Sequence, residues 1–210
     1  MLGGEPVTEP LSAVDQAILR AARDAVIEFG VRRTTLTEVA KRAGVSRPTV
    51  YRRWPHTGAL VADLLVLELR EIAVANVPAT GPGRKRLVTA IVAGSAQMRS
   101  NPVFGKIFRA DTDIMLTYVF ERLGRNQRKL ITLFATVIQE GQRDGSIRDG
   151  DSRQMATMLL LITQSAVQSA GTVEDWLDAE HLDIELAHAI DAYLAPTSHR
   201  FPPAHRKVLP

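Results

Sequence analysis

The chain of 210 residues contains no cysteine. Disulfide bridges, zinc sites built on thiolates and thiol-based redox sensing are therefore excluded. Aromatic residues are sparse at 5%, and no apolar run reaches the roughly 18 residues that a membrane-spanning helix requires. The first eleven residues include Glu5 and Glu9 and lack the apolar stretch of a secretory signal peptide. These absences predict a soluble, cytoplasmic protein that is not attached to a membrane.

The small net charge of +3 hides an uneven distribution of charge along the chain. Residues 32–53 contain seven basic side chains and one acidic side chain, whereas residues 151–195 contain one basic and eight acidic side chains. A dense cluster of positive charge is typical of a surface that binds a polyanion such as DNA. A merely solvated surface is the alternative that the charge alone leaves open.

Helical periodicity runs through nearly the whole chain, and no segment shows the alternation of apolar and polar residues that is typical of a strand. The sequence therefore predicts an all-α protein. The expected helices span residues 14–29, 36–43, 46–54, 57–76, 84–99, 102–109, 116–143, 155–170 and 174–194.

Two short helices joined by a tight turn follow the first helix. Thr35 and Glu38 match a capping box, in which the threonine hydroxyl accepts from the Glu38 amide while the Glu38 side chain reaches back. Gly44 ends this helix, and Ser46 caps the next one, which tolerates Pro48 in its first turn. The second helix is basic and begins with small polar side chains, which an ordinary helical hairpin does not need. The pattern predicts a helix-turn-helix, whose second helix enters the major groove of DNA.

The segment TLTEVAKRAGVSRPTVYRRWP at residues 35–55 resembles the DNA-binding segment of the TetR/AcrR family of bacterial transcriptional regulators. The resemblance is strong over residues 12–67, and beyond them only the helical architecture agrees. It implies an N-terminal three-helix DNA-binding domain and a C-terminal helical domain for ligand binding and dimerisation. The expected divisions are a flexible arm (1–11), the helix-turn-helix domain (12–56), the helical domain (57–195, with 57–76 as a connecting helix) and a proline-rich basic tail (196–210).

The resemblance also implies roles for individual residues. Arg47 and Thr49 are the best candidates to read bases, because arginine to guanine is the most common specific contact. Tyr51 matches a tyrosine that contacts phosphate. The family often has lysine where this chain has Thr57, which leaves that phosphate contact to a hydroxyl and backbone amides. The expected DNA-contact residues are Thr35, Thr37, Ser46, Arg47, Pro48, Thr49, Tyr51, Arg52, Arg53 and Thr57.

Aromatic and sulfur-containing residues gather in the middle helices, where the family houses an effector pocket. At helical spacing, such residues are more often part of an ordinary core. A cavity lined by them would favour a small, mostly apolar effector, for which two glutamines could supply polar anchors. The candidate pocket residues are Met98, Phe104, Phe108, Met115, Tyr118, Phe134, Gln164 and Gln168.

The last two helices carry apolar positions suited to a four-helix interface between two copies of the chain. Small residues among them would allow close approach. The candidate interface residues are Leu159, Ile162, Ala166, Ser169, Leu182, Leu186, Ala189, Ile190 and Tyr193.

A metal site is the alternative from another class of protein. His181, Glu185 and His188 share one helix face, and Glu185 and His188 form the Glu-x-x-His pattern of di-iron bundles. Such a site requires a second motif of this kind, which the chain lacks. No nucleophile elbow or glycine-rich phosphate loop is present. We therefore expect no cofactor, no metal and no catalytic residue.

The sequence thus predicts a DNA-binding transcriptional regulator, specifically a ligand-responsive homodimeric repressor. It would bind a palindromic operator in double-stranded DNA through residues 46–53. A regulator that activates transcription or does not respond to a ligand is the first alternative. A helical-bundle metalloenzyme is the second.

Overall fold

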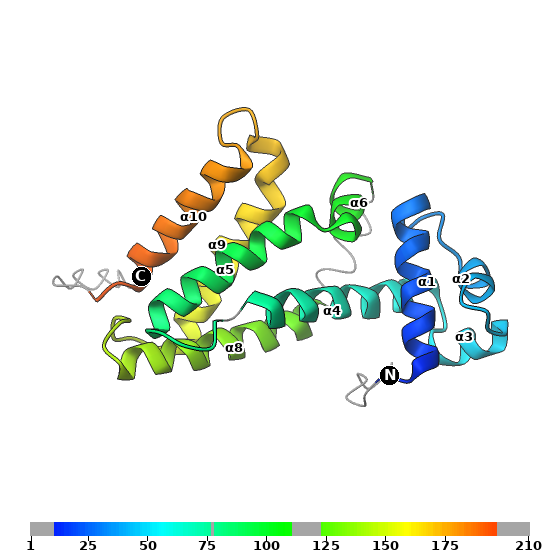
Figure 1. The fold of residues 1–210 in the computed structure, drawn as a ribbon, viewed down its shortest axis with the longest axis horizontal. Helices are drawn as coiled ribbons and strands as arrows, with labels where there is room; N and C mark the ends of the chain where they lie inside the picture. Colours follow the sequence, from blue (N-terminus) through cyan, green and yellow to red (C-terminus); the bar gives the residue numbers. More distant parts are fainter. Residues whose placement is uncertain (1–10, 77, 111–122, 197–210) are drawn as a thin grey trace, which may run out of the picture.

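The computed structural model describes residues 11–76, 78–110 and 123–196 (Figure 1). These residues form helices joined by turns, and none of them lies in a strand, which confirms the all-α fold class. Within the described residues, no helix is both long enough and apolar enough to cross a membrane. The helices are α1 (Ala13–Phe29), α2 (Leu36–Arg42), α3 (Arg47–Arg53), α4 (Thr57–Asn76), α5 (Gly83–Ser100), α6 (Pro102–Ala110), α8 (Leu123–Arg143), α9 (Ser152–Val173) and α10 (Ala179–Leu194).

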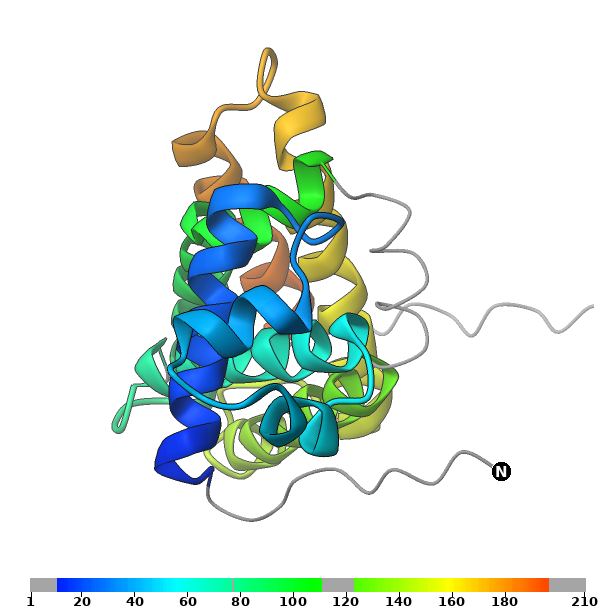
Figure 2. The same cartoon turned by 90° about the vertical axis from the view of Figure 1, so that its right-hand side faces the viewer.

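Helices α1, α2 and α3 gather at one end of the molecule, where the first turns of α4 complete their packing (Figures 1 and 2). A capping box starts α1: Ser12 Oγ accepts from the Asp15 amide at 3.1 Å, and Asp15 Oδ2 accepts from the Ser12 amide at 3.3 Å. These interactions satisfy amides that the helix leaves free. The side chains at the centre of this unit are Ile18, Leu19, Ala22, Val26, Val39, Val50, Trp54 and Leu60, each at most 2% exposed.

The capping box expected at the start of α2 is only half formed. Thr35 Oγ1 accepts from the Glu38 amide at 3.2 Å, as predicted. The Glu38 carboxylate does not complete the box, because it accepts instead from Arg42 Nε at 2.9 Å one turn ahead. Arg42 is itself held by Glu28 of α1 at 2.8 Å and lies over the Phe29 ring at 5.0 Å. A contact between helices therefore decides where the Glu38 side chain points.

The remaining helices form a second core around α5. Helix α4 leads away from the end formed by α1, α2 and α3, and α5 returns along it and packs on α8, α9 and α10 (Figure 1). Two ion pairs join α5 to α10, Arg84 to Asp191 at 3.3 Å and Arg99 to Asp183 at 2.5 Å. The buried side chains of this core include Leu87, Ile91, Ile138, Met155, Leu159, Leu186, Ile190 and Leu194.

The first turn of α5 packs closely against α8. A Cβ atom on Gly83 would lie 2.5 Å from the Cα of Gly141, so the two backbones touch at a pair of glycines. The Gly83 amide donates to Asp144 Oδ2 at 2.8 Å, and the Arg84 amide donates to Ser146 Oγ at 3.1 Å. Asp144 and Ser146 lie in the turn after α8, and their side chains cap the N-terminus of α5. Hydrogen bonds from the Ser146 side chain and from the Gly83 amide lower the pKa of the Asp144 carboxyl.

The bounds of α9 and α10 differ from those expected. Helix α9 spans Ser152–Val173 and not 155–170, and the last helix begins at Ala179 and not at residue 174. Asp178 explains this start, because its carboxylate accepts from the His181 amide at 2.9 Å and so caps the helix. Residues 116–122 of the expected long helix lie outside the described residues, and α8 is described from Leu123.

Candidate nucleic-acid interface

The turn between α2 and α3 is a Schellman motif. The Val45 amide donates to the Ala40 carbonyl at 3.0 Å, and the Gly44 amide donates to the Lys41 carbonyl at 3.3 Å. Gly44 adopts a φ of 67°, a left-handed conformation that glycine adopts without steric cost. This geometry turns the chain sharply enough for α3 to begin at Arg47, three residues after Gly44.

The start of α3 is capped by Ser46. Its Oγ accepts from the Thr49 amide at 3.3 Å and lies 2.8 Å from Thr49 Oγ1. The two hydroxyls predicted to meet DNA therefore bond to each other in this structure. Pro48 occupies the first turn of the helix, where a missing amide hydrogen has no cost.

Helix α3 has one buried face and one exposed face. Val50 is fully buried and fixes the helix on the core. Arg47, Tyr51 and Arg52 are exposed, and Tyr51 keeps 49% of its surface although it is aromatic. Pro48 is exposed on the first turn as well. The predicted base-reading arginine thus lies on an accessible surface.

Two side chains fasten the end of α3 to α4. Trp54 is 2% exposed, and its indole Nε1 donates to Asp63 Oδ2 at 2.8 Å. His56 caps α4, because its Nδ1 accepts from the Ala59 amide at 3.1 Å. Thr57 is the first residue of α4 and stands directly after this cap. The sequence prediction did not identify the role of His56, because histidine is not one of the residues that commonly cap a helix N-terminus.

Not every cation of residues 32–53 is free to meet DNA. Arg53, predicted as a DNA contact, lies 3.3 Å from Asp15 Oδ2 of α1. Arg42 is paired with Glu28 and Glu38, and its hydrogen bonds to these carboxylates raise its pKa. Both arginines therefore hold the helices of this unit together.

Three exposed cations remain available on α2 and α3, namely Lys41, Arg47 and Arg52. None of them forms an ion pair within the part of the chain that the structure describes. Thr35 is exposed at the N-cap of α2, and Thr37 is half-buried in its first turn. These side chains form a basic surface with hydroxyl groups, which can neutralise phosphates and contact base edges.

The residues of the predicted effector pocket lie in several different environments, and the pocket stays a prediction. Phe104 is only 3% exposed and packs in the core formed with α1 and α4. Met98 packs against that core, Phe134 packs against the second core, and Gln168 is exposed. Gln164 is half-buried. Met115, Tyr118 and the Phe108 side chain lie outside the described residues.

Four of the predicted interface residues are core residues of the single chain. Leu159, Leu182, Leu186 and Ile190 are at most 7% exposed. Helices α5 and α8 cover the inward face of α9, which carries Leu159, and α5 and α9 cover the inward face of α10, which carries the other three. They have almost no surface to offer to a partner, which corrects the prediction for these four. Among the other candidates, Ser169 and Ala189 are exposed, whereas Ile162, Ala166 and Tyr193 are half-buried.

The outward faces of α9 and α10 carry apolar residues that the sequence prediction missed. Met158 is 45% exposed, Leu161 is 55% exposed and Ile184 is 45% exposed. Met158 and Leu161 are spaced three residues apart, so they share one face of α9. Periodicity alone does not reveal which apolar stripe of a helix faces inward when the helix carries apolar residues on two sides.

The histidine face of α10 contains an ion pair. His181 Nδ1 lies 2.9 Å from Asp178 Oδ1, and this hydrogen bond raises the pKa of His181. Glu185 and His188 are exposed. Within the described residues, no group of three or more histidine or acidic side chains is arranged to hold a metal ion. The metalloenzyme alternative is not favoured.

Comparisons with known proteins agree with this geometry. The family model of bacterial regulatory proteins of the tetR family matches residues 18–64. A helix-turn-helix-type transcriptional regulator of Mycobacterium tuberculosis is 44% identical over 177 residues, which cover 84% of this chain and 92% of that protein.

Two solved structures share the fold. A TetR-family regulator from Rhodococcus sp. has a TM-score of 0.68 at 20% identity and covers 87% of this chain and 98% of its own. The complex of SmeT with triclosan has a TM-score of 0.65 at 19% identity, covering 95% and 100%. The helix-turn-helix geometry, the family match and the mycobacterial relative together show that this chain belongs to the TetR family of bacterial transcriptional regulators.

Proposed function

We propose that this regulator is a homodimeric repressor that binds a palindromic operator and responds to a small-molecule effector. The observation that carries the proposal is the exposed face of α3, with Arg47 and Arg52 unpaired among the described residues and Val50 anchored beneath them. A recognition helix reads base edges with side chains near its N-terminus, where Arg47 and Thr49 stand. Arg52 and Tyr51 supply phosphate contacts one turn later.

The DNA-contact set follows from this arrangement. Arg47 reads a base, with Pro48 and Thr49 beside it in the groove. Thr35, Thr37, Ser46 and Thr57 offer hydroxyls to the backbone, together with Tyr51 and Arg52. Arg53 already forms an ion pair with Asp15. We therefore assign it a secondary role in DNA binding, in which it adds positive charge to the surface around α3.

Dimerisation uses the outward faces of α9 and α10. The exposed apolar residues Met158, Leu161 and Ile184 provide a surface whose burial favours association. Ser169 and Ala189 are small and exposed, so they allow two helices to approach closely. A two-fold pair of recognition helices then matches the two halves of a palindrome.

An effector acts by binding more tightly to one arrangement of the dimer than to the other. SmeT, which shares this fold, has been solved with triclosan, a small molecule. This likeness supports a small effector for the present chain. Repression is preferred over activation because a dimer seated on an operator blocks other proteins from the same DNA. Because its partner is chromosomal DNA, we place the regulator in the cytoplasm.

The decisive experiment selects bound fragments of genomic DNA with the purified full-length chain. The expected result is a set of fragments that share an inverted repeat, and a reporter gene placed behind that repeat should be transcribed less when the regulator is present. Fragments without a common sequence would refute specific operator binding. Increased reporter transcription would refute repression and establish the activator alternative.

A further inference from the structure

The loop between α9 and α10 holds a tryptophan that its own chain leaves almost uncovered. Trp176 is 83% exposed, the highest value among the large apolar residues of the described part of the chain. Its backbone amide donates to the Val173 carbonyl at 2.9 Å, but its indole N–H has no hydrogen-bond partner among the described residues. The loop protrudes beyond the neighbouring helices in both views (Figures 1 and 2). A tryptophan in this position offers a large apolar surface to another molecule.

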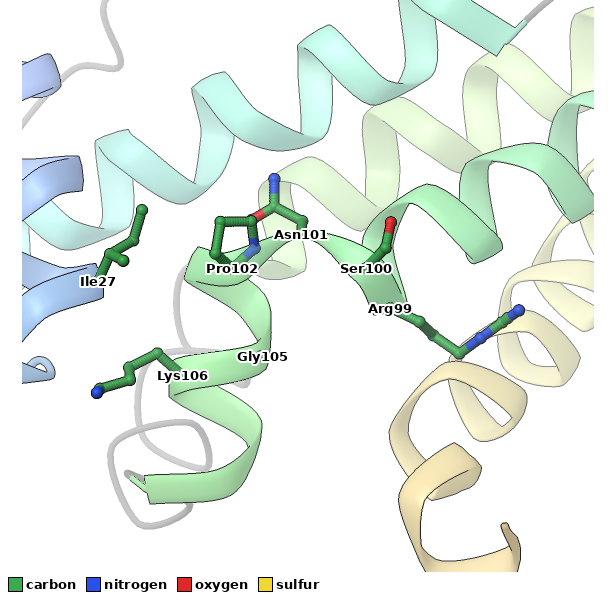
Figure 3. Close-up of a pocket in the computed structure, with 7 residues that line it drawn as sticks. All are labelled: Ile27, Arg99, Ser100, Asn101, Pro102, Gly105 and Lys106. Carbon is green, nitrogen blue, oxygen red and sulfur yellow. The ribbon is translucent and has the colours of Figure 1, made fainter. Parts of the chain in front are cut away.

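The loop is held firmly at its α10 end. Asp178 caps α10 by accepting from the His181 amide at 2.9 Å. Arg99, which lies at one edge of the pocket drawn in Figure 3, reaches from α5 and donates to Asp183 Oδ1 of α10 at 2.5 Å. These two contacts fix the start of α10. The outward position of Trp176 is therefore set by the fold.

The charges beside Trp176 are of one sign, and the opposite charge lies at the other end of α9. Glu174 and Asp175 are exposed next to the tryptophan. Arg153 is the single basic residue of residues 151–195, and it is exposed in the first turn of α9. It forms no ion pair within the described residues. Helix α9 places roughly 30 Å between Arg153 and these carboxylates, so they cannot meet within one chain.

A two-fold dimer brings the two ends of α9 together. Figure 2 views the molecule from the end formed by α1, α2 and α3, and α9, in yellow, runs up the picture, across the direction that leads to this end. Both recognition helices of a dimer reach one duplex when the two-fold axis points toward that end. A helix that runs across a two-fold axis meets its copy in antiparallel orientation. The start of α9 in one subunit then lies opposite the end of α9 in the other.

A glycine on α9 agrees with this antiparallel pairing. A symmetric pairing that places Arg153 opposite Trp176 of the partner subunit also places Met158 opposite Gly171 of the partner subunit. Gly171 is exposed within α9, its φ is not positive, and a Cβ atom there would meet nothing of its own chain within 4 Å. Glycine weakens a helix, and neither the backbone nor the packing of one chain requires it here. A second helix that approaches closely does, because the glycine leaves room for the methionine side chain.

We propose that Trp176 anchors the homodimer by packing against Arg153 of the partner subunit. The inference rests on the homodimer of the proposed function and identifies its anchor residue. The guanidinium lies over the indole, the aromatic group that attracts cations most strongly, and Glu174 and Asp175 neutralise its charge. The two copies of Trp176 bury roughly 300–500 Å², about a quarter of the roughly 1,600 Å² of a standard interface. The antiparallel arrangement also keeps the two acidic loops apart, which avoids repulsion between like charges.

Tryptophan fluorescence measures this contact in the full-length chain. The chain has two tryptophans, and Trp54 is only 2% exposed, so a change in accessibility reports on Trp176. We expect acrylamide to quench neither tryptophan strongly in the dimer. Dilution below the dissociation constant should make one of them accessible, and Trp176→Phe should abolish this change. An indole that is readily quenched in the dimer overturns the anchor.

Charge reversal identifies the group that Trp176 and its neighbours contact. Arg153→Glu and Asp175→Arg should each raise the dissociation constant of the dimer about tenfold or more, because each places like charges at the contact. The double variant should dimerise again. An equimolar mixture of the two single variants should do so as well, because both contacts of the mixed dimer then join opposite charges. Arg20→Glu on the exposed side of α1 is the matched control and should change nothing.

Sedimentation separates failure of this inference from failure of the proposed function. Trp176→Ala should raise the dissociation constant at least about thirtyfold, whereas Val14→Ala, at an exposed apolar residue of α1, should not. Dimerisation that is unchanged in Trp176→Ala refutes the anchor. Charge reversals that have no effect, or that do not rescue each other, refute its contact with Arg153. Both results leave the homodimer intact, whereas an unmodified chain that is monomeric at every concentration refutes the homodimer itself.

Discussion

The indole Nε1 of Trp54 donates a hydrogen bond to Asp63 Oδ2 at 2.8 Å, which joins the end of the recognition helix to α4. Trp54 is only 2% exposed, so water cannot replace Asp63 as the acceptor. Helix α4 in turn leads to the second core. This buried hydrogen bond is therefore one of the contacts that fix the orientation of α3, together with the buried Val50 and the Arg53–Asp15 ion pair.

Replacing Asp63 with alanine should lower the free energy of unfolding by about 1–3 kcal/mol, because the buried indole N–H loses its acceptor. Asp63→Asn retains an acceptor oxygen and should cost less. Asp24→Ala on the exposed side of α1 is the control and should change little. Urea denaturation measures all three variants. Equal stability of Asp63→Ala and Asp24→Ala would contradict the role of this bond.

Replacing Arg47 with alanine should weaken operator binding by about 1–3 kcal/mol and relax the preference at one base pair, since Arg47 is the base-reading candidate. Tyr51→Phe should weaken cognate and scrambled DNA alike, because a phosphate contact carries no base information. Arg128→Ala on α8 removes the same charge from an exposed site away from α3.

Fluorescence anisotropy with cognate and scrambled duplexes distinguishes these three variants. An equal loss on both duplexes for Arg47→Ala would assign it to phosphate contact. A loss in Arg128→Ala as large as in Arg47→Ala would show that overall charge, and not the recognition helix, controls binding.

Replacing Leu161 with glutamate should dissociate the proposed dimer, because it places a charge on the most exposed apolar residue of α9. Sedimentation should show about twice the 23.0 kDa chain mass for the unmodified protein and the single-chain mass for Leu161→Glu. Val14→Glu is the matched control, since Val14 is 45% exposed on α1 at the other end of the molecule. A Leu161→Glu protein that remains dimeric would place the interface elsewhere.

The Asp178–His181 pair should make the stability of α10 depend on pH. The hydrogen bond that His181 donates to the Asp178 carboxylate raises the pKa of His181, and the amide and side chain of His181 lower the pKa of Asp178. The stabilisation from a raised histidine pKa is present at low pH and is lost as the pH rises through that pKa. The stabilisation from a lowered carboxyl pKa is lost as the pH falls through it. The pair is therefore most effective between the two values.

Asp178→Asn keeps a capping oxygen for α10 and removes the charge. In this variant His181 should titrate at lower pH in NMR spectra. The stability difference from the unmodified chain should be present at about pH 5 and should decrease above the raised pKa of His181. An unchanged titration of His181 would show that Asp178 does not act on it.

Local interactions explain which features the sequence predicted well. A cap joins residues three positions apart, as between Ser46 and Thr49, and a glycine turn depends on the φ of a single residue, Gly44. Such features follow from neighbouring residues alone, and the helix-turn-helix was predictable for this reason. The Glu38 side chain shows the limit of this approach. It binds Arg42 and does not complete the expected capping box, and Arg42 is positioned by Glu28 of another helix.

The order of amino acids was enough to predict the helical class, the turn and caps of the helix-turn-helix, and the accumulation of cations around α3. The packing of the helices was needed to show that Asp15 holds Arg53, that Glu68 connects α1 to Asn101, and that Leu186 belongs to the core of one chain. The difference arises from distance along the chain. Periodicity shows that a residue is apolar or charged, but its partners come from helices many residues away, and only their packing determines which side chains remain exposed.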